Sequence, residues 1–245
     1  MNLFDLTGRT IVVTGGAGHL GRPICMGLAS SGARVICLSS KELILPPKEG
    51  RSEIKSIVCD IQDEAAFEAS LPERVHGLVN CAVRAPRRPD LDMSRAAFNA
   101  AFDTICTHYF TCSRIAAKRM LRGSIVNVAS MWGNRSPDLA TYLDLENEPS
   151  LAMSAGAGAI LGLTRYMATL MAPKYVRVNA LIPGWFPKQR GPNRADYIAE
   201  IEKRVPMARI GGAHEIVGPT LFLLSDASSY MTGQQLIIDG GASIV

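Results

Sequence analysis

The sequence lacks the features that define several large classes of proteins. No apolar run reaches the roughly 18 residues that a membrane-spanning helix needs. The first ten residues include Asp5 and lead into a strand-like run, which is not the pattern of a secretory signal. No two cysteines have the C-x-x-C spacing and the four histidines are far apart, so no metal site is predicted. The excess of 26 basic over 22 acidic residues is small and dispersed, which argues against a nucleic acid or membrane partner.

The composition is that of a globular protein. Hydrophobic residues make up 47% and charged residues 20% of the 245 residues, so the chain can bury a core without disulfides. Most of the six cysteines lie in apolar runs, where free cysteine acts as a small hydrophobe. We therefore predict reduced thiols and a cytoplasmic protein. No linker, repeat or low-complexity tract interrupts the chain, so we predict one domain over residues 1–245.

Short apolar runs alternate with helical patterns along the whole chain. The predicted strands are Thr10–Thr14, Arg34–Leu38, Ile54–Cys59, Gly77–Cys81, Ser124–Ala129, Val176–Leu181 and Gln235–Ile238. The predicted helices are His19–Ser31, Glu64–Ser70, Ser94–Leu121, Ser154–Ala172, Ala195–Lys203 and His214–Leu224. Apolar strands separated by helices indicate an α/β fold, a doubly wound parallel sheet of about seven strands with helices on both faces. Two long loops, Ala82–Asp92 and Gly133–Pro149, are candidates for functional segments.

Glycines concentrate where the first strand meets the first helix, in the segment Thr14–Gly21. Glycine there lets the backbone approach a pyrophosphate, and the helix N-terminus adds N–H groups and the positive end of its dipole. The pattern therefore predicts dinucleotide binding. Asp60 ends the third strand and Asn80 the fourth, at the carboxyl edge where ligands bind in open α/β sheets.

With these motifs the chain resembles the short-chain dehydrogenase/reductase family over nearly its whole length. The motifs that carry the resemblance are the glycine loop, Asp60, Asn80-Cys81-Ala82, Ser124–Ser130, Gly162–Arg165, Arg177–Gly184, Met231–Gln235 and Asp239–Gly241. The resemblance implies a seven-stranded Rossmann-type sheet and NAD(P)(H). It also implies the cofactor-binding residues Gly15, Gly18, His19, Leu20, Gly21, Ser39, Ser40, Lys41, Asp60, Ile61, Asn80, Ala82, Pro183 and Gly184. Two motifs depart from the family: the T-G-x-x-G-x-x-G spacing is typical of its extended members, and Cys81-Ala82-Val83 replaces the Ala-Gly that usually follows the Asn.

The family's catalytic Asn, Ser, Tyr and Lys are only partly present. Ser130 matches the Ser, but the register set by Gly162–Arg165 places Met153 at the Tyr position and Ala157 at the Lys position. Counting back from Phe110 places Ile105 at the Asn position. Methionine and alanine have no transferable proton, so the ordinary proton relay through these positions is excluded.

Another residue is then needed for acid/base chemistry, unless the domain binds dinucleotide without redox turnover. Tyr142 lies 12 residues after Ser130, close to the family's interval, and is our candidate alongside Ser130. Glu146 follows it where a Lys would lower the pKa of the Tyr, and a Glu has the opposite effect. His19 and His108 are weaker candidates.

The cofactor's 2′ position is read after the second strand, where acidic residues hold the ribose hydroxyls of NAD. This chain has Ser39-Ser40-Lys41, which favours NADP over NAD. Six cations in two segments beyond the strand ends suit a small anionic or sugar-like substrate: Arg84, Arg87, Arg88, Lys188, Arg190 and Arg194. Trp185 and Phe186 suit a narrow cofactor pocket, stacking on a sugar ring, or simple anchoring of their loop.

Two functions therefore remain open at this stage. The first is an NAD(P)-dependent oxidoreductase with a rearranged acid/base group. The second is a dinucleotide-binding protein without alcohol or carbonyl redox activity, such as a non-redox enzyme, a sensor or an inactive partner subunit. In both cases the carboxyl-terminal segment Met231–Val245 and the helical segment Ser94–Leu121 resemble the family's interfaces, which predicts a homodimer or homotetramer.

Overall fold

The sheet of seven parallel strands organises the protein. The structure is a computed structural model that describes residues 2–44, 54–84, 93–139, 150–188 and 194–245. The strands are β1 (Thr10–Thr14), β2 (Arg34–Ser39), β3 (Ile54–Val58), β4 (Gly77–Asn80), β5 (Gly123–Val128), β6 (Val176–Pro183) and β7 (Gln235–Ile238). Their order is β3-β2-β1-β4-β5-β6-β7, so the direction of strand addition reverses between β1 and β4. This confirms the predicted doubly wound sheet and locates its switch point.

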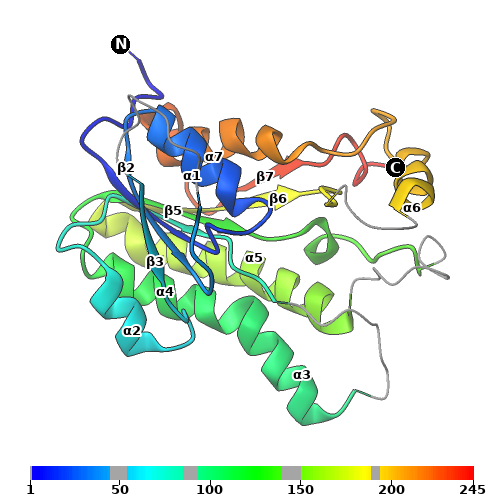
Figure 1. Cartoon of the computed structure of the whole chain (residues 1–245), viewed down its shortest axis with the longest axis horizontal. Coiled ribbons are helices and arrows are strands. Elements are labelled where there is room, and N and C mark those ends of the chain that lie inside the picture. The colour runs from blue at the N-terminus through cyan, green and yellow to red at the C-terminus, as the bar shows by residue number, and fades with distance from the viewer. Residues whose placement is uncertain (1, 45–53, 85–92, 140–149, 189–193) are drawn as a thin grey trace.

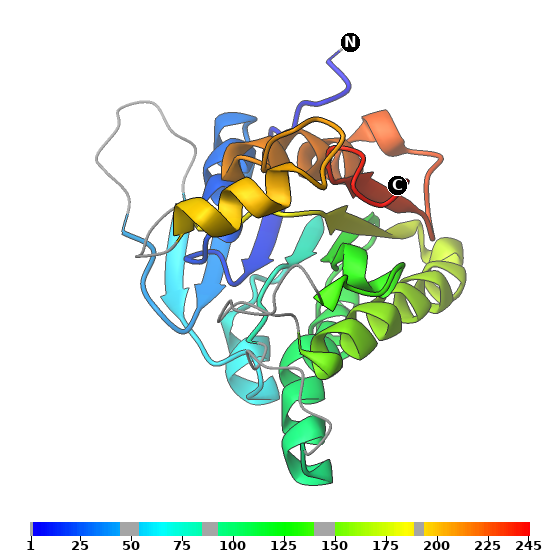
Figure 2. The ribbon, with the colours of Figure 1, turned by 90° about the vertical axis from the view of Figure 1, so that its right-hand side faces the viewer.

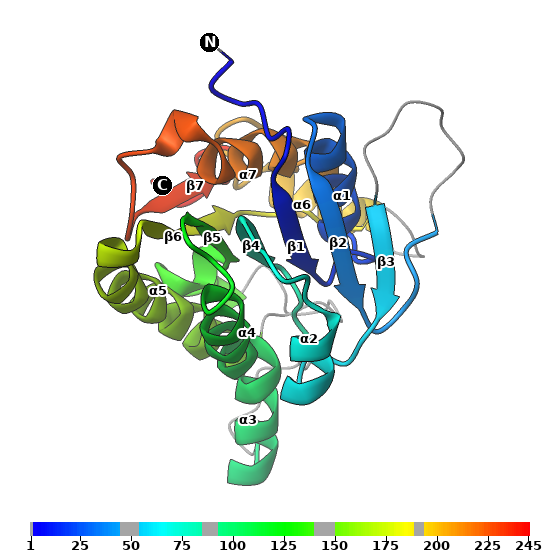
Figure 3. The same ribbon diagram turned by 90° about the vertical axis from the view of Figure 1, so that its left-hand side faces the viewer.

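Helices cover both faces of the sheet, and Figure 3 shows α1 and α7 on one side and α2, α4 and α5 on the other. The α-helices are α1 (Gly21–Ser30), α2 (Glu64–Ser70), α3 (Arg95–Phe102), α4 (His108–Ala117), α5 (Leu151–Met171), α6 (Arg194–Glu202) and α7 (Val217–Leu224). Short 3-10 turns are η2 (Met131–Gly133), η4 (Ala172–Lys174), η5 (Ala213–Ile216) and η6 (Asp226–Ser228).

Successive side chains of each strand point to opposite faces of the sheet, and they contribute to two apolar cores. In β1, Ile11 and Val13 pack with α1 and α7, whereas Val12 packs with α2, α4 and α5 on the opposite face. A third apolar cluster, which includes Ile105 and Tyr109, lies where α3, α4 and α5 meet α6. Because both faces are buried, the strands are continuously apolar rather than alternating with polar residues.

Several predicted helix boundaries were wrong: for example, α5 begins at Leu151 rather than Ser154, and α7 begins at Val217 rather than His214 because η5 precedes it. The single helix predicted for Ser94–Leu121 is interrupted by a π-helix, η1 (Asp103–Thr107), between α3 and α4. The helix predicted from His19 begins at Gly21, because Gly18-His19-Leu20 completes the turn out of β1. The apolar spacing continues through η1 and through the start of α1, so the sequence pattern did not reveal either change.

The carboxyl ends of the strands lie together at one end of the molecule. Figure 1 shows β6 running toward the end that carries α6 and the C-terminus, and Figure 2 looks directly onto that end. The glycine loop after β1 and the segments after β4, β5 and β6 therefore meet there. No helix among the described residues is long and apolar enough to cross a membrane.

Candidate functional site

The glycine loop makes a close backbone contact with the end of β4. Gly15 has φ +68°, and a Cβ on it would lie 2.7 Å from Cα of Ala82. Its N–H donates to the carbonyl of Leu38 over 2.7 Å, which joins the loop to β2. Thr14 Oγ1 accepts from the N–H of Cys81 over 3.1 Å. A side chain at position 15 would therefore push the end of β1 away from the segment that follows β4.

The start of α1 is open to an anion. Gly21 packs directly on the carbonyl oxygen of Gly15, which leaves no room for a Cβ. Leu20, at the N-cap, provides no side-chain hydrogen bond, and the first turn contains no acidic residue. An uncapped helix N-terminus beside a glycine turn is the arrangement that binds phosphate groups.

His19 lies between this loop and the segment after β6. Its ring faces the backbone carbonyls of Phe186 and Pro187, and Lys188 is close enough to act on its charge. Burial lowers the pKa of His19, Lys188 lowers it further, and the carbonyls oppose both effects. The Nε2 atom is buried and has no hydrogen-bond partner. The predicted cofactor residue therefore has a free ring nitrogen near the start of α1.

The residues predicted to bind the cofactor beyond the glycine loop lie at the ends of β2 and β3. Ser39 is half-buried, whereas Ser40 and Lys41 are exposed. Asp60 is exposed, and its carboxylate accepts from the N–H of Gln62 over 3.0 Å. The next residue, Ile61, is half-buried. The polar side chains of Ser40, Lys41 and Asp60 are therefore accessible at the carboxyl edge of the sheet.

Asn80 points into the sheet rather than out of its edge. The side chain is fully buried, and its amide nitrogen donates to Ser113 Oγ (2.9 Å) and to Asn127 Oδ1 (2.8 Å). Asn127 in turn donates to Thr164 Oγ1 over 2.9 Å. This chain of buried polar groups ties β4 and β5 to α4 and α5. The side-chain amide of Asn80 thus holds the ends of β4 and β5 together. Two residues further along the chain, Ala82 contacts Gly15 of the glycine loop.

Ser130 follows β5 and begins η2. Its Oγ accepts from the N–H of Trp132 over 3.3 Å, which leaves the hydroxyl hydrogen able to donate elsewhere. The side chain is 9% exposed. On the far side of the same edge, Pro183 ends β6, and the N–H of Gly184 donates to the carbonyl of Ile238 in β7.

The positions that the sequence register assigned to the catalytic Asn, Tyr and Lys are occupied by apolar side chains near Ser130. Ala157 is fully buried, and a Cβ on Gly133 in η2 would lie 2.8 Å from its carbonyl carbon. Ile105 is fully buried, and a Cβ on Gly156 would lie 2.5 Å from its Cγ2. Met153 is half-buried in the first turn of α5 and packs on the same cluster. These residues offer no group that transfers a proton.

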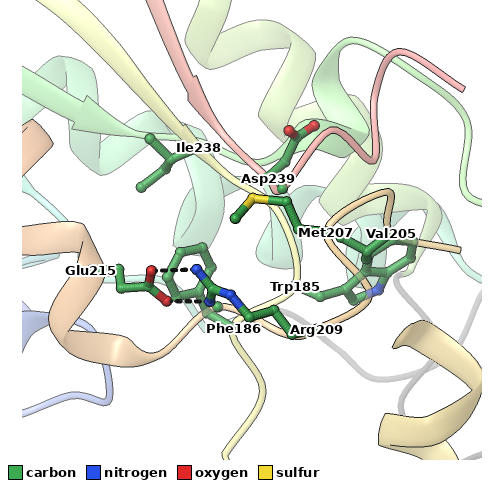
Figure 4. A pocket seen from close by; sticks show the side chains of 10 residues that line it. Trp185, Phe186, Val205, Met207, Arg209, Glu215, Ile238 and Asp239 are labelled. Atoms are coloured by element: carbon green, nitrogen blue, oxygen red, sulfur yellow. Dashed lines mark hydrogen bonds and ion pairs between the residues drawn. The ribbon is translucent and has the colours of Figure 1, made fainter. Parts of the chain in front are cut away.

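Two tryptophan rings meet close to a pocket at the ends of β6 and β7. Trp132 and Trp185 meet edge to face, with ring centroids 5.6 Å apart. Trp185 also lines a pocket of about 260 Å³ beyond the ends of β6 and β7 (Figure 4). In that pocket Arg209 and Glu215 form a two-pronged ion pair of 2.7 and 2.8 Å. The hydrogen bonds from Arg209 and from the N–H of Gly212 lower the pKa of Glu215 to about 2, so Arg209 and Glu215 neutralise each other in the pocket.

Several predicted residues fall outside the described ranges or are described only in part. Tyr142, Glu146, Arg87, Arg88 and Arg190 lie outside the described residues. Arg194 begins α6, but its side chain is not described. Arg84 and Lys188 are both exposed.

Sequence reasoning underestimated one pair of residues. His108 and Tyr109, the first two residues of α4, are bonded to the ends of β4 and β5: His108 Nε2 lies 2.7 Å from the carbonyl of Ala82, and the Tyr109 hydroxyl donates to the carbonyl of Val128 over 2.8 Å. Burial raises the pKa of Tyr109 well above 10, so this hydroxyl is not an acid/base group at neutral pH. The only signal in the sequence was two adjacent ring residues with polar atoms in an apolar helix.

Known proteins resemble the chain over nearly its full length. The family model described as enoyl-(acyl carrier protein) reductase matches residues 15–243. Galactitol 2-dehydrogenase (L-tagatose-forming) from Cereibacter sphaeroides is 32% identical, and the match covers 99% of this chain and 98% of the relative. A short-chain dehydrogenase from Leptospira borgpetersenii, solved with bound NAD+, has a TM-score of 0.86 at 27% identity over 98% of this chain and 94% of that one. A putative 2-deoxy-D-gluconate 3-dehydrogenase from Agrobacterium tumefaciens, solved with bound NADP, has a TM-score of 0.85 at 27% identity over 100% of both chains.

The fold and the glycine loop thus define a doubly wound α/β protein of the Rossmann type. The chain belongs to the short-chain dehydrogenase/reductase family, as its motifs predicted. Its relatives are named dehydrogenases and reductases, which supports an oxidoreductase. The family neighbours solved with NAD+ and with NADP support a nicotinamide dinucleotide as the cofactor.

Proposed function

We propose that the chain is an NAD(P)-dependent oxidoreductase that acts on a small sugar-like or anionic alcohol or carbonyl compound. The observation that carries the proposal is the cofactor half of the site. Gly15 packs backbone to backbone on Ala82, and α1 begins without a capping side chain. The free end of α1, with His19 beside it, would hold the pyrophosphate. The bound nicotinamide supplies or accepts the hydride.

The substrate class is supported by the relatives and by the surroundings of Ser130. The first relative named above is a galactitol dehydrogenase, and the NADP-bound neighbour is a putative dehydrogenase of a sugar acid. Ser130 would donate to the substrate oxygen, and the indole faces of Trp132 and Trp185 suit the C–H face of a sugar. The charge of Lys188 would attract a carboxylate or phosphate.

The cofactor preference that we propose is NADP over NAD. Ser39, Ser40 and Lys41 offer two hydroxyls and a cation next to the glycine loop, because Leu38 pairs with Thr14 across β2 and β1. Hydroxyls and an ammonium group bind a 2′-phosphate, whereas NAD selection uses an acidic residue. The proton donor or acceptor would come from outside α5, with Tyr142 as the candidate.

A second function is favoured by one specific observation. Ile105, Met153 and Ala157 are apolar, and the first and last are fully buried, at the positions that the sequence register assigns to the family's catalytic Asn, Tyr and Lys. A domain with these residues would bind a dinucleotide but would not oxidise alcohols by the usual route. It would act as a non-redox enzyme, a sensor or an inactive partner subunit.

A paired assay separates the two functions. NADH and NADPH are titrated into the protein by fluorescence, and turnover is measured over a panel of polyols, sugar acids and simple secondary alcohols. We expect binding, tighter for NADPH, and turnover of a polyol or sugar acid. Binding without turnover over the panel would favour the second function, and absence of binding for both nucleotides would contradict both.

We propose further that the protein is cytoplasmic and a homodimer or homotetramer. The six cysteines are free thiols, five of them buried, which suits a reducing compartment. Exposed apolar side chains on α4 and α5 (Phe110, Tyr166 and Leu170) and near the C-terminus (Ile244) suit interfaces between copies of the chain.

A further inference from the structure

The π-helix η1 holds the segment that follows β4 by several hydrogen bonds. Thr104 Oγ1 donates to the carbonyl of Arg84 over 2.6 Å, and the Arg84 N–H donates to the carbonyl of Thr104 over 3.4 Å. Just after η1, His108 reaches the carbonyl of Ala82. Segments of π-helix are rare, and they are frequently found at functional sites.

His108 is placed between two carbonyl groups. Its Nε2 lies 2.7 Å from the carbonyl oxygen of Ala82, and its Nδ1 lies 3.1 Å from that of Asp103. Burial lowers the pKa of this histidine, so its ring is neutral at pH 7 and carries one N–H. On the shorter of the two distances we assign the hydrogen to Nε2, which then donates to the carbonyl of Ala82. The ring is 4% exposed, so water does not replace this bond.

The carbonyl that His108 holds belongs to the residue on which the glycine loop rests. Ala82 Cα is the atom nearest to the Cβ that Gly15 lacks, at 2.7 Å. Thr14 Oγ1 holds the N–H groups of Cys81 and Ala82, at 3.1 and 3.4 Å. The position of Ala82 is therefore set from the sheet by Thr14 and from the helix layer by His108. Moving it moves the wall of the glycine loop.

We propose that His108 is a positioning residue that fixes the backbone of Ala82 against the glycine loop and so preorganises the site for the dinucleotide. The proposal rests on the proposed function, because it concerns the binding of the same cofactor. Tyr109 performs the equivalent task for β5 by bonding the carbonyl of Val128, two residues before Ser130. The first turn of α4 thus fixes two adjacent strand ends. A preformed site loses less entropy when the ligand binds.

Two amide substitutions test this role because each reproduces one nitrogen of the ring. The side-chain amide of His108→Gln reaches the place of Nε2 and can donate to Ala82. The shorter amide of His108→Asn reaches only the place of Nδ1, near Asp103. His108→Leu keeps an apolar side chain and donates to neither. His76→Gln, at the opposite edge of the sheet, is the control, since the ring of His76 accepts from the N–H of Thr10 there.

The readouts are the dissociation constant for NADH, the thermal midpoint, and hydrogen exchange of a peptide that covers residues 77–84. Losing one hydrogen bond to a buried carbonyl weakens NADH binding about three- to tenfold. We expect that loss and faster exchange of the peptide in His108→Asn and His108→Leu. In His108→Gln, which keeps a donor to Ala82, we expect a dissociation constant for NADH within about twofold of that of the parent. The dissociation constant of His76→Gln should equal that of the parent.

Equal dissociation constants in all variants would overturn the proposal. An equal loss of NADH affinity in His108→Gln and His108→Asn, accompanied by a lowered thermal midpoint in both, would also overturn it. That result would show that the histidine acts through packing and not through its hydrogen bond. If His108→Leu does not fold, the comparison of the two amides still decides. If the parent binds neither NADH nor NADPH, the proposed function fails, while the hydrogen exchange of residues 77–84 still shows whether His108 fixes the strand end.

Discussion

Gly18 lies where the chain turns from β1 into α1, and a Cβ there would be 2.9 Å from the carbonyl oxygen of Gly15. We predict that Gly18→Val abolishes the binding of NADH and NADPH, because the side chain would disturb the turn and occupy the approach of the pyrophosphate. Fluorescence titration measures this. Gly162→Ala in α5 is the matched control, since its Cβ would meet nothing within 4 Å. Unchanged nucleotide binding in Gly18→Val would contradict the placement of the cofactor.

The control substitution Gly162→Ala is also expected to change the stability of the protein. Gly162 lies inside α5, and alanine restricts the unfolded chain without a clash in the folded one. Gly162→Ala should raise the free energy of unfolding by about 0.5–1 kcal/mol. Urea unfolding of the two proteins measures the difference. A lower free energy in the variant would show that position 162 is packed against another chain or segment.

Three histidines, one buried and two half-buried, link neighbouring elements and should give the fold a pH dependence. His76 joins β1 to β4, His108 joins α4 to the end of β4, and His19 lies between the glycine loop and the segment after β6. Burial is the largest cause that lowers each pKa from the ordinary 6.5. The folded protein therefore binds fewer protons than the unfolded chain below about pH 6.5. Acid then favours unfolding.

We accordingly predict that the free energy of unfolding is retained above the ordinary histidine pKa and falls as the pH drops through the lowered values. Urea unfolding at a series of pH values measures the decline, and His76→Gln should make it shallower because that position no longer titrates. A free energy of unfolding that rises on acidification would refute the attribution of the pH dependence to these histidines. So would a His76→Gln variant whose stability depends on pH as steeply as that of the parent.

At the level of elements, the strands were predictable and the site was predictable only in part. Buried parallel strands are continuous apolar runs, so the predicted ends of β1 and β7 agree with the structure. The π-helix was missed because Ile105 and Tyr109 keep a helical spacing across it. The inward turn of Asn80 was also missed, because a strand end alone does not tell which face a side chain takes. The bond from His108 to Ala82 joins positions 26 residues apart, which no local pattern encodes.

For the whole molecule, exposed apolar side chains predict self-association. Tyr166 and Leu170 on α5 are 74% and 62% exposed, and Phe110 on α4 is 46% exposed. Covering them in a two-fold interface removes apolar surface from water. We predict a dimer or tetramer by light scattering, which Leu170→Glu shifts toward smaller species. A parent protein that stays monomeric at every concentration would contradict this prediction.

Residues 1–245 would then form one domain within each subunit, as proposed from the sequence. The sheet joins β3 near the start of the chain to β7 near its end, and the two cores on its faces share the same strands. Hydride transfer in such a subunit would depend on where the proton goes, since α5 carries Met153 and Ala157 where the sequence register expects Tyr and Lys.

The most direct test of that dependence is the rate at which simple secondary alcohols reduce NAD+ and NADP+. Three proteins are compared: the parent, the double variant Met153→Tyr with Ala157→Lys, and Tyr142→Phe. A positioned acid/base group contributes roughly 10²–10⁴-fold to a rate, so we predict a parent near background and a faster double variant. Thermal unfolding and nucleotide titration confirm that each variant folds and binds. A fast parent that stays fast as Tyr142→Phe would contradict both the loss of the proton relay and its replacement.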